Sequence, residues 1–456
     1  MKAAIVGGGI SGLATAQAIL AQAPDSEVVI FEAGTRAGGK VHTEMTPEGY
    51  LCEWGVNAFL NKVPRTLELC SEVGVSPVTA NTAAQKRYVF SEGELHKLPE
   101  KPPEFFSSNL LSVPGRVRVI GEVFSGRSEK PDETLEEFGT RHLGREAFEK
   151  LIDPMASGVF AGDARKMSLK SCFPRIHEVE SEYGSLIRGL IKLQKAARKA
   201  GKKDTPGPGP GGTLTSFEHG MSVLTDTLAA ELGSRVRLNS PVEAVSSSGG
   251  LYTVHLADGQ FEEFDRLVLA APAYAQARIL QDFLPAVSRQ LEAIPYPAVA
   301  VVCMGYSRQR MGSGLDGFGF LVPSREKRGI LGTVVDSNVF PNRAPEGSVL
   351  LRTLVGGARS SQFAELPEQQ MLDRVLGDLN DILDLETDPE FVSVYRHQRA
   401  IPQYLVGHAD RLEAIDEELK RHPGLLLTGN AFRGVSLNDC VVNAARVAES
   451  LTARGD

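Results

Sequence analysis

Glycines near the start of the chain, in the stretch AIVGGGISGL, have a spacing that could hold a phosphate-bearing ligand. They follow a short apolar run, Ala3–Val6, and precede a stretch of helical composition. In a turn of this kind the first glycine permits a tight bend and the second lets a pyrophosphate approach the backbone. The third lets the helix pack against the strand, and the helix start offers free N–H groups to the phosphates. The residues predicted to touch the ligand here are Gly7, Gly9, Ile10, Ser11 and Gly12.

A carboxylate 20 residues beyond Gly12 strengthens this prediction. Glu32 ends a second apolar, β-branched run, Val28–Phe31, where its oxygens can accept hydrogen bonds from ribose hydroxyls. Strand, glycine turn, helix and strand together predict a βαβ unit with parallel strands and a right-handed crossover. The alternative is a purely structural turn, which would not need a carboxylate at this spacing.

The elements that position such a site belong to a chain of 456 residues, which suits two or three domains. A hydrophobic content of 42% allows a large core, and a net charge of −8 argues against nucleic-acid binding. Five scattered cysteines without C-x-x-C spacing indicate reduced thiols and no metal site. The chain leaves no room for a signal peptide before the first strand, and no apolar run reaches the ~18–20 residues of a membrane span. We therefore expect a cytoplasmic protein.

The segment after Glu32 indicates which dinucleotide is bound. Together with Glu32, the stretch Arg36–Lys40 (RAGGK) resembles flavoproteins of the amine oxidase superfamily, which carry E-x-x-x-R-x-G-G-[RK]. The resemblance implies that this segment closes over the adenine–pyrophosphate half of FAD, and an ordinary β-turn is the alternative. Glu53–Phe59 (EWGVNAF) is similar to the superfamily's E-x-G-x-x stretch beside the flavin ring. The residues implied at the cofactor are Glu32, Ala33, Arg36, Gly38, Gly39, Lys40, Gly55, Val56, Asn57 and Ala58.

The C-terminal part is predicted to return to the same domain. Residues 425–430 (LLLTGN) read as a strand that ends in small and polar residues, and 434–440 (GVSLNDC) enter a helix. Backbone N–H groups at that helix start can stabilise negative charge on a reduced flavin ring. The resemblance also implies one residue at the adenine, Val242, and, from a looser match, one near the flavin, Arg396. The cofactor residues predicted here are Val242, Arg396, Gly429, Asn430, Gly434, Val435 and Ser436.

Five further segments narrow the resemblance to the oxygen-dependent, FAD-containing protoporphyrinogen oxidases. They are GVFAGD (158–163), LKSCFP (169–174), GFGFLVP (317–323), IPQY (401–404) and LNDC (437–440). The resemblance implies a six-electron oxidation of a porphyrinogen to a porphyrin, in which hydride passes to flavin N5 and O2 reoxidises the flavin to give H2O2. It implies substrate contacts at Gly162, Phe318, Leu321 and Leu354, although periodicity alone would place the last three in an ordinary sheet core. We predict no catalytic side chain, because no nucleophile–base or paired-carboxylate signature is present.

The fold implied by the resemblance is α/β, with a discontinuous Rossmann-like FAD-binding domain, a mixed β substrate-binding domain and a helical membrane-facing domain. The predicted boundaries are 1–86, 213–272 and 400–456 for FAD binding, 87–201 for the helical domain, 202–212 for a flexible loop, and 273–399 for substrate binding. The resemblance also implies a homodimer, peripheral contact with the inner face of the cell membrane and hand-over of product to ferrochelatase. Leu110–Phe124 is the candidate for membrane contact, with a plain packed helix as the alternative.

Three other functions fit parts of the pattern. A coproporphyrinogen III oxidase would share the fold and every quoted motif, and its substrate carries four carboxylates rather than two, so a more basic slot would favour it. For an FAD amine oxidase, the Asn-Asp before Cys440 and the aromatic content of 7% argue against the expected covalent-flavin motif and tyrosine cage. A flavin-free, prenyl-binding protein of the same fold would not need the intact glycine motif and Glu32.

Overall fold

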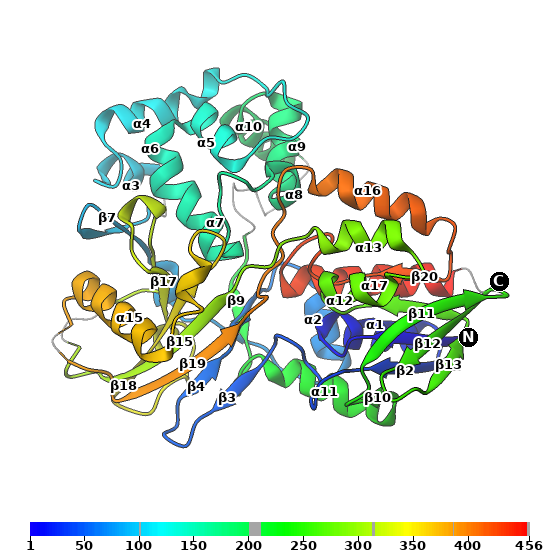
Figure 1. The fold of residues 1–456 in the computed structure, drawn as a ribbon. Helices are drawn as coiled ribbons and strands as arrows, with labels where there is room; N and C mark the ends of the chain where they lie inside the picture. The colour runs from blue at the N-terminus through cyan, green and yellow to red at the C-terminus, as the bar shows by residue number, and fades with distance from the viewer. Residues whose placement is uncertain (100–101, 200–210, 312–314, 386, 454–456) are drawn as a thin grey trace.

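The nucleotide-binding part of the protein is a parallel sheet built from both ends of the chain. The structure, a computed structural model, describes residues 1–99, 102–199, 211–311, 315–385 and 387–453, so the predicted loop 202–212 lies outside it except for its last two residues. The sheet has the order β10-β2-β1-β14-β20 and every neighbouring pair is parallel. Its strands are β1 (Lys2–Val6), β2 (Glu27–Phe31), β10 (Val236–Arg237), β14 (Arg266–Leu269) and β20 (Leu425–Leu427). The predicted parallel α/β fold is therefore confirmed, and the two chain ends lie on the same side of the molecule (Figure 1).

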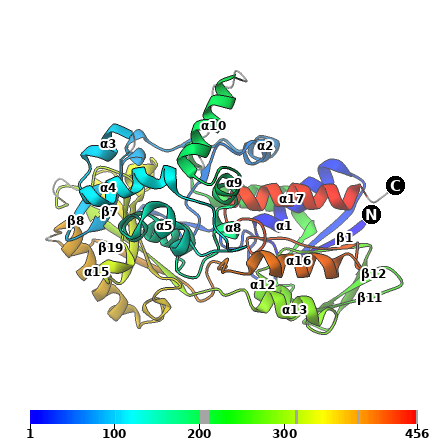
Figure 2. The same cartoon turned by 90° about the horizontal axis from the view of Figure 1, so that it is seen from above.

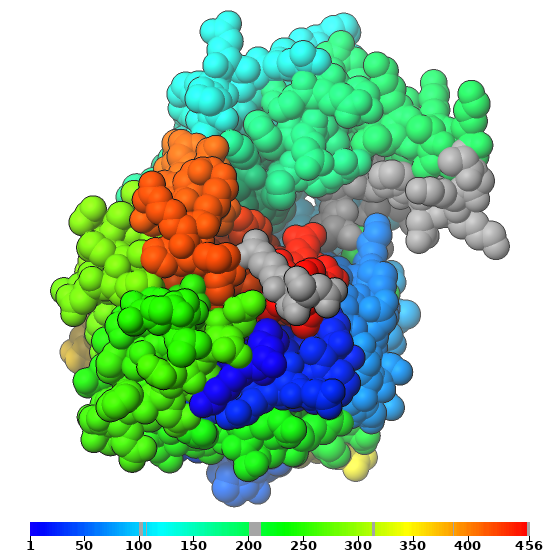
Figure 3. Space-filling model, turned by 90° about the vertical axis from the view of Figure 1, so that its right-hand side faces the viewer, coloured from blue at the N-terminus to red at the C-terminus, as the bar shows by residue number. Residues whose placement is uncertain are grey.

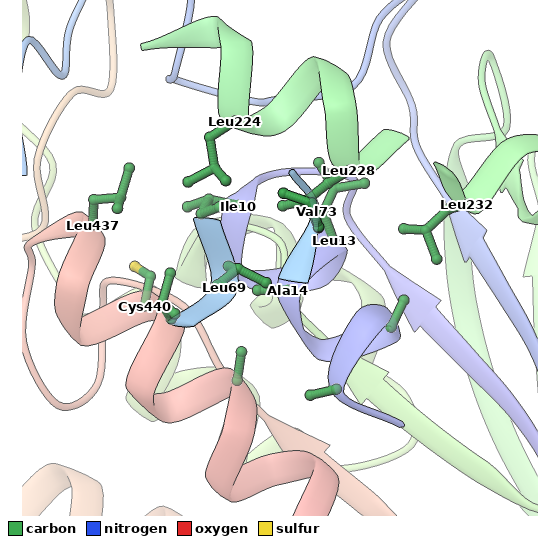
Figure 4. Close-up of a cluster of buried hydrophobic side chains, with 14 of the residues drawn as sticks. Ile10, Leu13, Ala14, Leu69, Val73, Leu224, Leu228, Leu232, Leu437 and Cys440 are labelled. Carbon is green, nitrogen blue, oxygen red and sulfur yellow. The ribbon is translucent and has the colours of Figure 1, made fainter. Parts of the chain in front are cut away.

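One face of this sheet is covered by helices from distant parts of the sequence. They are α1 (Ile10–Gln22), α2 (Pro64–Glu72), α11 (Ser222–Leu232) and α17 (Leu437–Thr452). Leu13, Leu69, Leu228 and Cys440 are among the buried side chains that pack between them (Figure 4). Helices α1 and α17 lie side by side (Figure 2), and Figure 3 shows the first and last segments of the chain adjoining on the surface. The helix starts that follow β1 and β20 are thereby brought to the same edge of the sheet.

The opposite face is covered by a small antiparallel sheet and three helices. The small sheet contains β11 (Val242–Ser248), β12 (Leu251–Leu256) and β13 (Phe261–Phe264). The helices are α12 (Ala273–Leu280), α13 (Pro285–Glu292) and α16 (His408–Leu419). Burial on both faces explains why the central strands are almost wholly apolar.

A second, seven-stranded sheet has the order β19-β15-β18-β17-β16-β7-β8 and is antiparallel except between β16 and β7. Its strands are β7 (Arg87–Ser91), β8 (Glu94–Lys97), β15 (Val299–Ser307), β16 (Gly319–Leu321), β17 (Ile330–Val335), β18 (Ser348–Gly356) and β19 (Phe391–His397). Alternate residues such as Val302 and Leu351 pack in one core with Leu379 of α15 (Glu368–Leu383). The other face carries Val301, Cys303 and Tyr395, which pack against residues of the N-terminal region. This second face is called the inner face below.

The helical part contains α3 (Pro102–Ser107), α4 (Val113–Ile120), α5 (Leu135–Leu143), α6 (Arg145–Ala147), α7 (Asp153–Phe160), α8 (Leu169–Cys172), α9 (Pro174–Tyr183) and α10 (Leu186–Lys199). It differs from the predicted helical region at its start, because residues 87–97 form β7 and β8 of the seven-stranded sheet. The consecutive apolar, β-favouring residues of RYVFS are typical of a buried strand, and the predicted boundary at residue 87 did not take them into account. Helix α10 projects from the body (Figure 2).

Short sheets connect these parts. Strands β3 (Thr43–Met45) and β4 (Leu51–Glu53) form a hairpin, and β5 (Phe59–Leu60), β6 (Val78–Thr79) and β9 (Leu214–Ser216) form a three-stranded sheet. Within the described ranges, no helix has both the length and the apolar character needed to cross a membrane.

Candidate functional site

The three glycines of the first turn serve different purposes. A Cβ on Gly12 would lie 1.9 Å from the carbonyl oxygen of Gly7, and a Cβ on Gly7 would lie 2.8 Å from the backbone nitrogen of Ala271. Both glycines are therefore required by the packing of the protein itself. A Cβ on Gly9 would meet only the Cα of Gly39, at 3.9 Å. Gly9 is thus the glycine whose missing side chain leaves room for a ligand.

The start of α1 is suited to an anion. Gly9 is its N-cap, no side chain caps it, and its first turn has no acidic residue. The N–H groups of this first turn lie at the carboxyl edge of the parallel sheet, where ligands bind in folds of this class. Ile10 and Ser11, which are also predicted at the cofactor, are buried in this first turn.

Glu32 lies directly after β2, at the same edge. Its two carboxylate oxygens accept hydrogen bonds from the backbone N–H groups of Gly8 and Gly34, each at 2.7 Å. A carboxylate accepts about four hydrogen bonds, so capacity is left for ribose hydroxyls. Val242 is buried in the cluster that includes Val6 and Phe31, the residue before Glu32. The predicted ribose and adenine contacts therefore belong to elements that share one core.

The loop between Ala33 and Lys40 is held by its own long side chains. The Arg36 guanidinium donates to the carbonyls of Ala37 (2.8 Å) and Gly39 (2.7 Å), and the N–H of Gly38 donates to the carbonyl of Gly8 (2.7 Å). The Lys40 ammonium donates to the carbonyls of Arg399 (2.8 Å) and Ala400, and burial lowers its pKa to about 8. In this structure both cations fix the loop beside Gly9, while Ala33 is exposed.

The C-terminal residues meet the glycine turn from the other side. Gly429 follows β20, and a Cβ there would approach the carbonyls of Ala270 and Ala271 only to 3.8 Å. The carbonyl of Asn430 accepts a hydrogen bond from the Tyr404 hydroxyl (2.7 Å). Half-buried Val435 follows Gly434. The predicted cofactor residues 429–436 therefore adjoin the strand ends of β14 and β20.

The start of α17 is closed by a capping box. Ser436 Oγ accepts from the N–H of Asp439, and the Asp439 carboxylate accepts from the N–H of Ser436 (3.1 Å). A Cβ on Gly434, which has a φ of +110°, would lie 2.2 Å from the Asp439 carboxyl carbon. Only the remaining N–H groups of this first turn are available to a ligand, which is fewer than the sequence suggested.

The segment Gly55–Ala58 runs from the glycine turn to the second sheet. A Cβ on Gly55 would lie 2.9 Å from the carbonyl oxygen of Lys40. Val56 packs against the cluster that contains Ile10 and Leu437, and Ala58 packs against the cluster that contains Phe318. Half-buried Asn57 lies between them. A dinucleotide that extends from Gly9 toward the second sheet would pass this segment.

Two predicted substrate residues form a row on the inner face. Leu321 of β16 is paired with Gly332 of β17, and Gly332 is paired with Leu354 of β18. Directly paired residues point to the same face of a sheet, so two leucines flank a position without a side chain. Leu321 and Leu354 are half-buried, and Phe318 at the start of β16 is also half-buried. A Cβ on Gly332 would lie 3.1 Å from Leu321 Cδ2, so the Leu321 side chain lies beside this glycine and the row forms an apolar surface.

Gly162 and Arg396 have other surroundings than those predicted. A Cβ on Gly162 would lie 2.2 Å from the Met167 sulfur, so packing within the helical part already requires a glycine here, and its substrate contact stays a prediction. Arg396 lies one residue from both Tyr395 and His397 on β19 and therefore points to the opposite face, where it donates to the carbonyls of Ala364 (2.7 Å) and Leu366 (2.8 Å). The structure does not bring Arg396 to the predicted flavin site.

Sequence reasoning missed Arg87. Its guanidinium carbon lies 5.5 Å from the centre of the Phe318 ring, because Arg87 of β7 is paired with Gly319 of β16. Arg87 is exposed, and none of the ion pairs found among the described residues includes it. The run Tyr88–Phe90 directly after Arg87, which favours a strand, was the available signal. A cation beside an apolar surface is the arrangement that a ring system with carboxylates would need.

A buried carboxylate also lies next to the site. Glu53 is 1% exposed and accepts hydrogen bonds from Thr43 Oγ1 (2.7 Å) and from the N–H of Met221 (2.8 Å). Burial raises the pKa of Glu53 to about 7, although the two hydrogen bonds act to lower it. Glu53 thus ties β4 to β3 and to the start of α11 immediately before Trp54 and Gly55.

Comparison with known proteins identifies the group to which this architecture belongs. The model of the flavin-containing amine oxidoreductase family matches residues 10–452. The chain is 34% identical to the chloroplastic protoporphyrinogen oxidase of Oryza sativa subsp. japonica, over 98% of this chain and 87% of the relative. It is 31% identical to the coproporphyrinogen III oxidase of Bacillus subtilis, over 98% of this chain and 97% of the relative. The chain therefore belongs to the flavin-containing amine oxidoreductase family.

A solved structure agrees over the same length. A protein of Exiguobacterium sp., provisionally assigned as a protoporphyrinogen oxidase, superposes with a TM-score of 0.83 at 28% identity and covers 99% of this chain and 98% of its own. Reduced UDP-galactopyranose mutase (TM-score 0.75, 18% identity) shares the fold alone. The predicted oxidoreductase class and the resemblance that suggested it are confirmed.

FAD is the cofactor of this family, and the site fits it. The open space at Gly9, the uncapped start of α1 and the remaining capacity of Glu32 match the pyrophosphate and ribose of a dinucleotide. When bound, FAD supplies the two-electron acceptor of the reaction. The residues of this chain that would hold it are those at the start of α1 for the phosphates, Glu32 for the ribose, and the segment Gly55–Ala58 for the half that extends toward the inner face.

Proposed function

We propose that this protein oxidises a porphyrinogen to a porphyrin with FAD and O2, releasing H2O2, in haem biosynthesis. The observation that carries the proposal is the apolar row Leu321–Gly332–Leu354 on the inner face, with Phe318 beside it. The apolar pyrrole rings of a porphyrinogen are suitable occupants for a surface formed by these leucines and Phe318. The names of the relatives, protoporphyrinogen and coproporphyrinogen III oxidases, support the same substrate class.

The chemical task of the protein side chains is limited. Aromatisation of a porphyrinogen is downhill, so the enzyme has to position the macrocycle against the cofactor and exclude water. Apolar groups on the inner face serve this purpose, and we assign no general base to them.

The reaction is tested by aerobic turnover of the purified flavoprotein. Porphyrin fluorescence and H2O2 are measured together with protoporphyrinogen IX as substrate. A six-electron oxidation with O2 as acceptor predicts about three H2O2 per porphyrin formed. Porphyrin formation no faster than spontaneous oxidation would contradict the proposal.

Coproporphyrinogen III is the second candidate substrate, and Arg87 favours it. A substrate with four carboxylates gains more from a cation at the edge of the apolar row than one with two. The coproporphyrinogen III oxidases of Bacillus subtilis and Staphylococcus aureus also match this chain over nearly their whole length. Parallel measurement of both substrates distinguishes the candidates.

We also propose a peripheral membrane contact through α4 and the 3₁₀ turn η2 (Gly121–Phe124). Val113, Val117, Ile120 and Phe124 are 64%, 63%, 48% and 89% exposed. Their spacing places the three helical residues on one side of α4. The neighbouring α10 contains only basic charged residues: Arg188, Lys192, Lys195, Arg198 and Lys199. An apolar side next to a basic helix is typical of binding to anionic lipid.

Sedimentation with vesicles of phosphatidylcholine and phosphatidylglycerol tests this contact. The double variant Val117→Ser/Phe124→Ser is expected to lose most of the vesicle-bound fraction. The control is Phe261→Ser, which removes a side chain that is 66% exposed on the distant strand β13. Equal binding of all three proteins would contradict the contact. The homodimer and the hand-over to ferrochelatase stay predictions from the resemblance.

A further inference from the structure

Trp54, the only tryptophan of the chain, lies where the nucleotide-binding part meets the seven-stranded sheet. Its ring stacks on Tyr395 of β19, with ring centres 4.6 Å apart and planes inclined by 25°. The Trp54 ring also contacts the His42 ring, and the two ring centres lie 4.0 Å apart. Stacked aromatic pairs of this kind contribute about 0.5–1.5 kcal/mol beyond the area that they bury.

Polar groups fix the same ring in one orientation. The Glu44 carboxylate accepts hydrogen bonds from Trp54 Nε1 (3.2 Å) and from the Tyr395 hydroxyl (2.8 Å). His397 Nε2 donates to the carbonyl of Trp54 (2.8 Å), and the N–H of Trp54 donates to the carbonyl of His42 (2.9 Å). Every polar group of Trp54, in the backbone and in the ring, therefore has a partner. Two of the residues involved, Tyr395 and His397, belong to the second sheet.

The residues that follow Trp54 are those that a bound dinucleotide would pass. A Cβ on Gly55 would lie close to the Lys40 carbonyl, and Val56 packs against the cluster that includes Ile10 and Leu437. Ala58 packs, as Phe318 does, against the cluster of Ala84, Val339 and Phe340. This segment has no regular secondary structure, so its position depends on what holds its ends. Trp54 fixes the N-terminal end of this segment, where Gly55 lies beside Lys40.

We propose that Trp54, Glu44 and Tyr395 form an interdomain latch that positions the segment Gly55–Ala58 for the ring half of FAD. The latch deepens the proposed function, on whose cofactor it rests, and makes Trp54 a positioning residue. The dinucleotide half of FAD is held by Gly9, α1 and Glu32 and does not depend on the latch. Breaking the latch therefore weakens the contribution of the ring half alone.

A second stack between the same two regions provides a matched control. Tyr50 stacks on Phe391 of β19, with ring centres 4.6 Å apart and planes inclined by 15°. It joins the β3–β4 hairpin to the same strand at the same ring distance, but Tyr50 lies before β4 and Trp54 after it. A substitution in this stack weakens the packing between the two regions but leaves Trp54 unchanged.

The test compares the affinities of the full-length chain, freed of flavin, for FAD and for ADP by calorimetry. ADP lacks the ring half, so the ratio of the two affinities reports only what the ring half adds. Trp54→Leu is expected to lower this ratio about tenfold, and Tyr395→Phe, which removes only the hydroxyl bonded to Glu44, about threefold. Phe391→Leu is expected to leave the ratio within about twofold of the parent value.

An unchanged ratio in Trp54→Leu, or in Tyr395→Phe should Trp54→Leu not fold, would overturn the latch. An equal fall in Phe391→Leu would overturn it too, because packing between the regions would then be the cause. Neither titration contains a porphyrinogen, so a failure of the proposed activity leaves this result interpretable, and a failure of the latch leaves the activity open.

Discussion

The edge of the parallel sheet and the inner face of the seven-stranded sheet offer different groups to the ligands proposed for them. At the edge the groups are backbone N–H groups, and glycines such as Gly9 leave them accessible. On the inner face the proposed groups are leucine and phenylalanine side chains, which resemble any other sheet core. A site made of backbone leaves a pattern in the sequence, whereas a site made of apolar side chains does not.

Among the variants that test this comparison, Gly9→Val is expected to have the largest effect, which is on FAD affinity. The valine would occupy the open space at the start of α1, so FAD affinity is expected to fall at least about a hundredfold while the fold is retained. Flavin absorbance of the purified protein and circular dichroism measure the two properties. Gly12→Val is the contrasting variant, since its side chain would clash with the Gly7 carbonyl and destabilise the protein itself. Full flavin content in Gly9→Val would refute the assignment.

The next effect concerns Glu53, where the two regions meet. Its folded pKa of about 7 lies above the ordinary value of 4.5, so the stability it contributes is present below pH 4.5 and is lost as the pH rises through 7. The free energy of unfolding is therefore expected to fall by on the order of 3 kcal/mol between these pH values. Glu53→Gln, whose amide does not ionise, is expected to lack this fall. Denaturant unfolding of both proteins at pH 5 and pH 8 measures it, and parallel pH profiles for the two would contradict the prediction.

A smaller effect is expected on the inner face. Phe318→Ala removes apolar surface from the proposed substrate site, and the KM for the porphyrinogen is expected to rise about tenfold with flavin content unchanged. Steady-state kinetics and flavin absorbance measure both. Val302→Ala, on the face that packs against α15, is the control, because it alters the sheet without touching the inner face. An unaltered KM in Phe318→Ala would remove this residue from the site.

The smallest effect is expected from Arg87→Gln. Loss of an exposed cation is expected to raise the KM for coproporphyrinogen III about threefold and the KM for protoporphyrinogen IX less. Arg87→Lys, which keeps the charge, is expected to restore part of the difference. Equal changes in the KM for both substrates would show that Arg87 does not bind the substrate carboxylates.

The same difference explains which parts of the site could be predicted from the sequence. The order of Gly7, Gly9, Gly12 and Glu32 indicated the βαβ unit and its ligand because each position has its own backbone requirement. Arg396 was misplaced because a match to a motif does not fix which face of a strand a residue occupies. Gly162 was assigned to the substrate from a motif match, which does not reveal that a Cβ there would meet Met167, five residues on, and the distant Gln403. The role of Trp54 depends on contacts with another sheet, which no local pattern encodes, and the position of Arg87 beside Phe318 depends on the pairing of β7 with a strand more than 200 residues later.

Anaerobic reduction of the bound flavin tests the central claim most directly. The holoenzyme is mixed in a stopped-flow instrument with protoporphyrinogen IX and, separately, with coproporphyrinogen III, while flavin absorbance is followed. The account predicts rapid loss of the oxidised flavin spectrum with at least one of them, and slower loss in Phe318→Ala at the same substrate concentration. A flavin that stays oxidised with both porphyrinogens but is reduced by an alkylamine would contradict it.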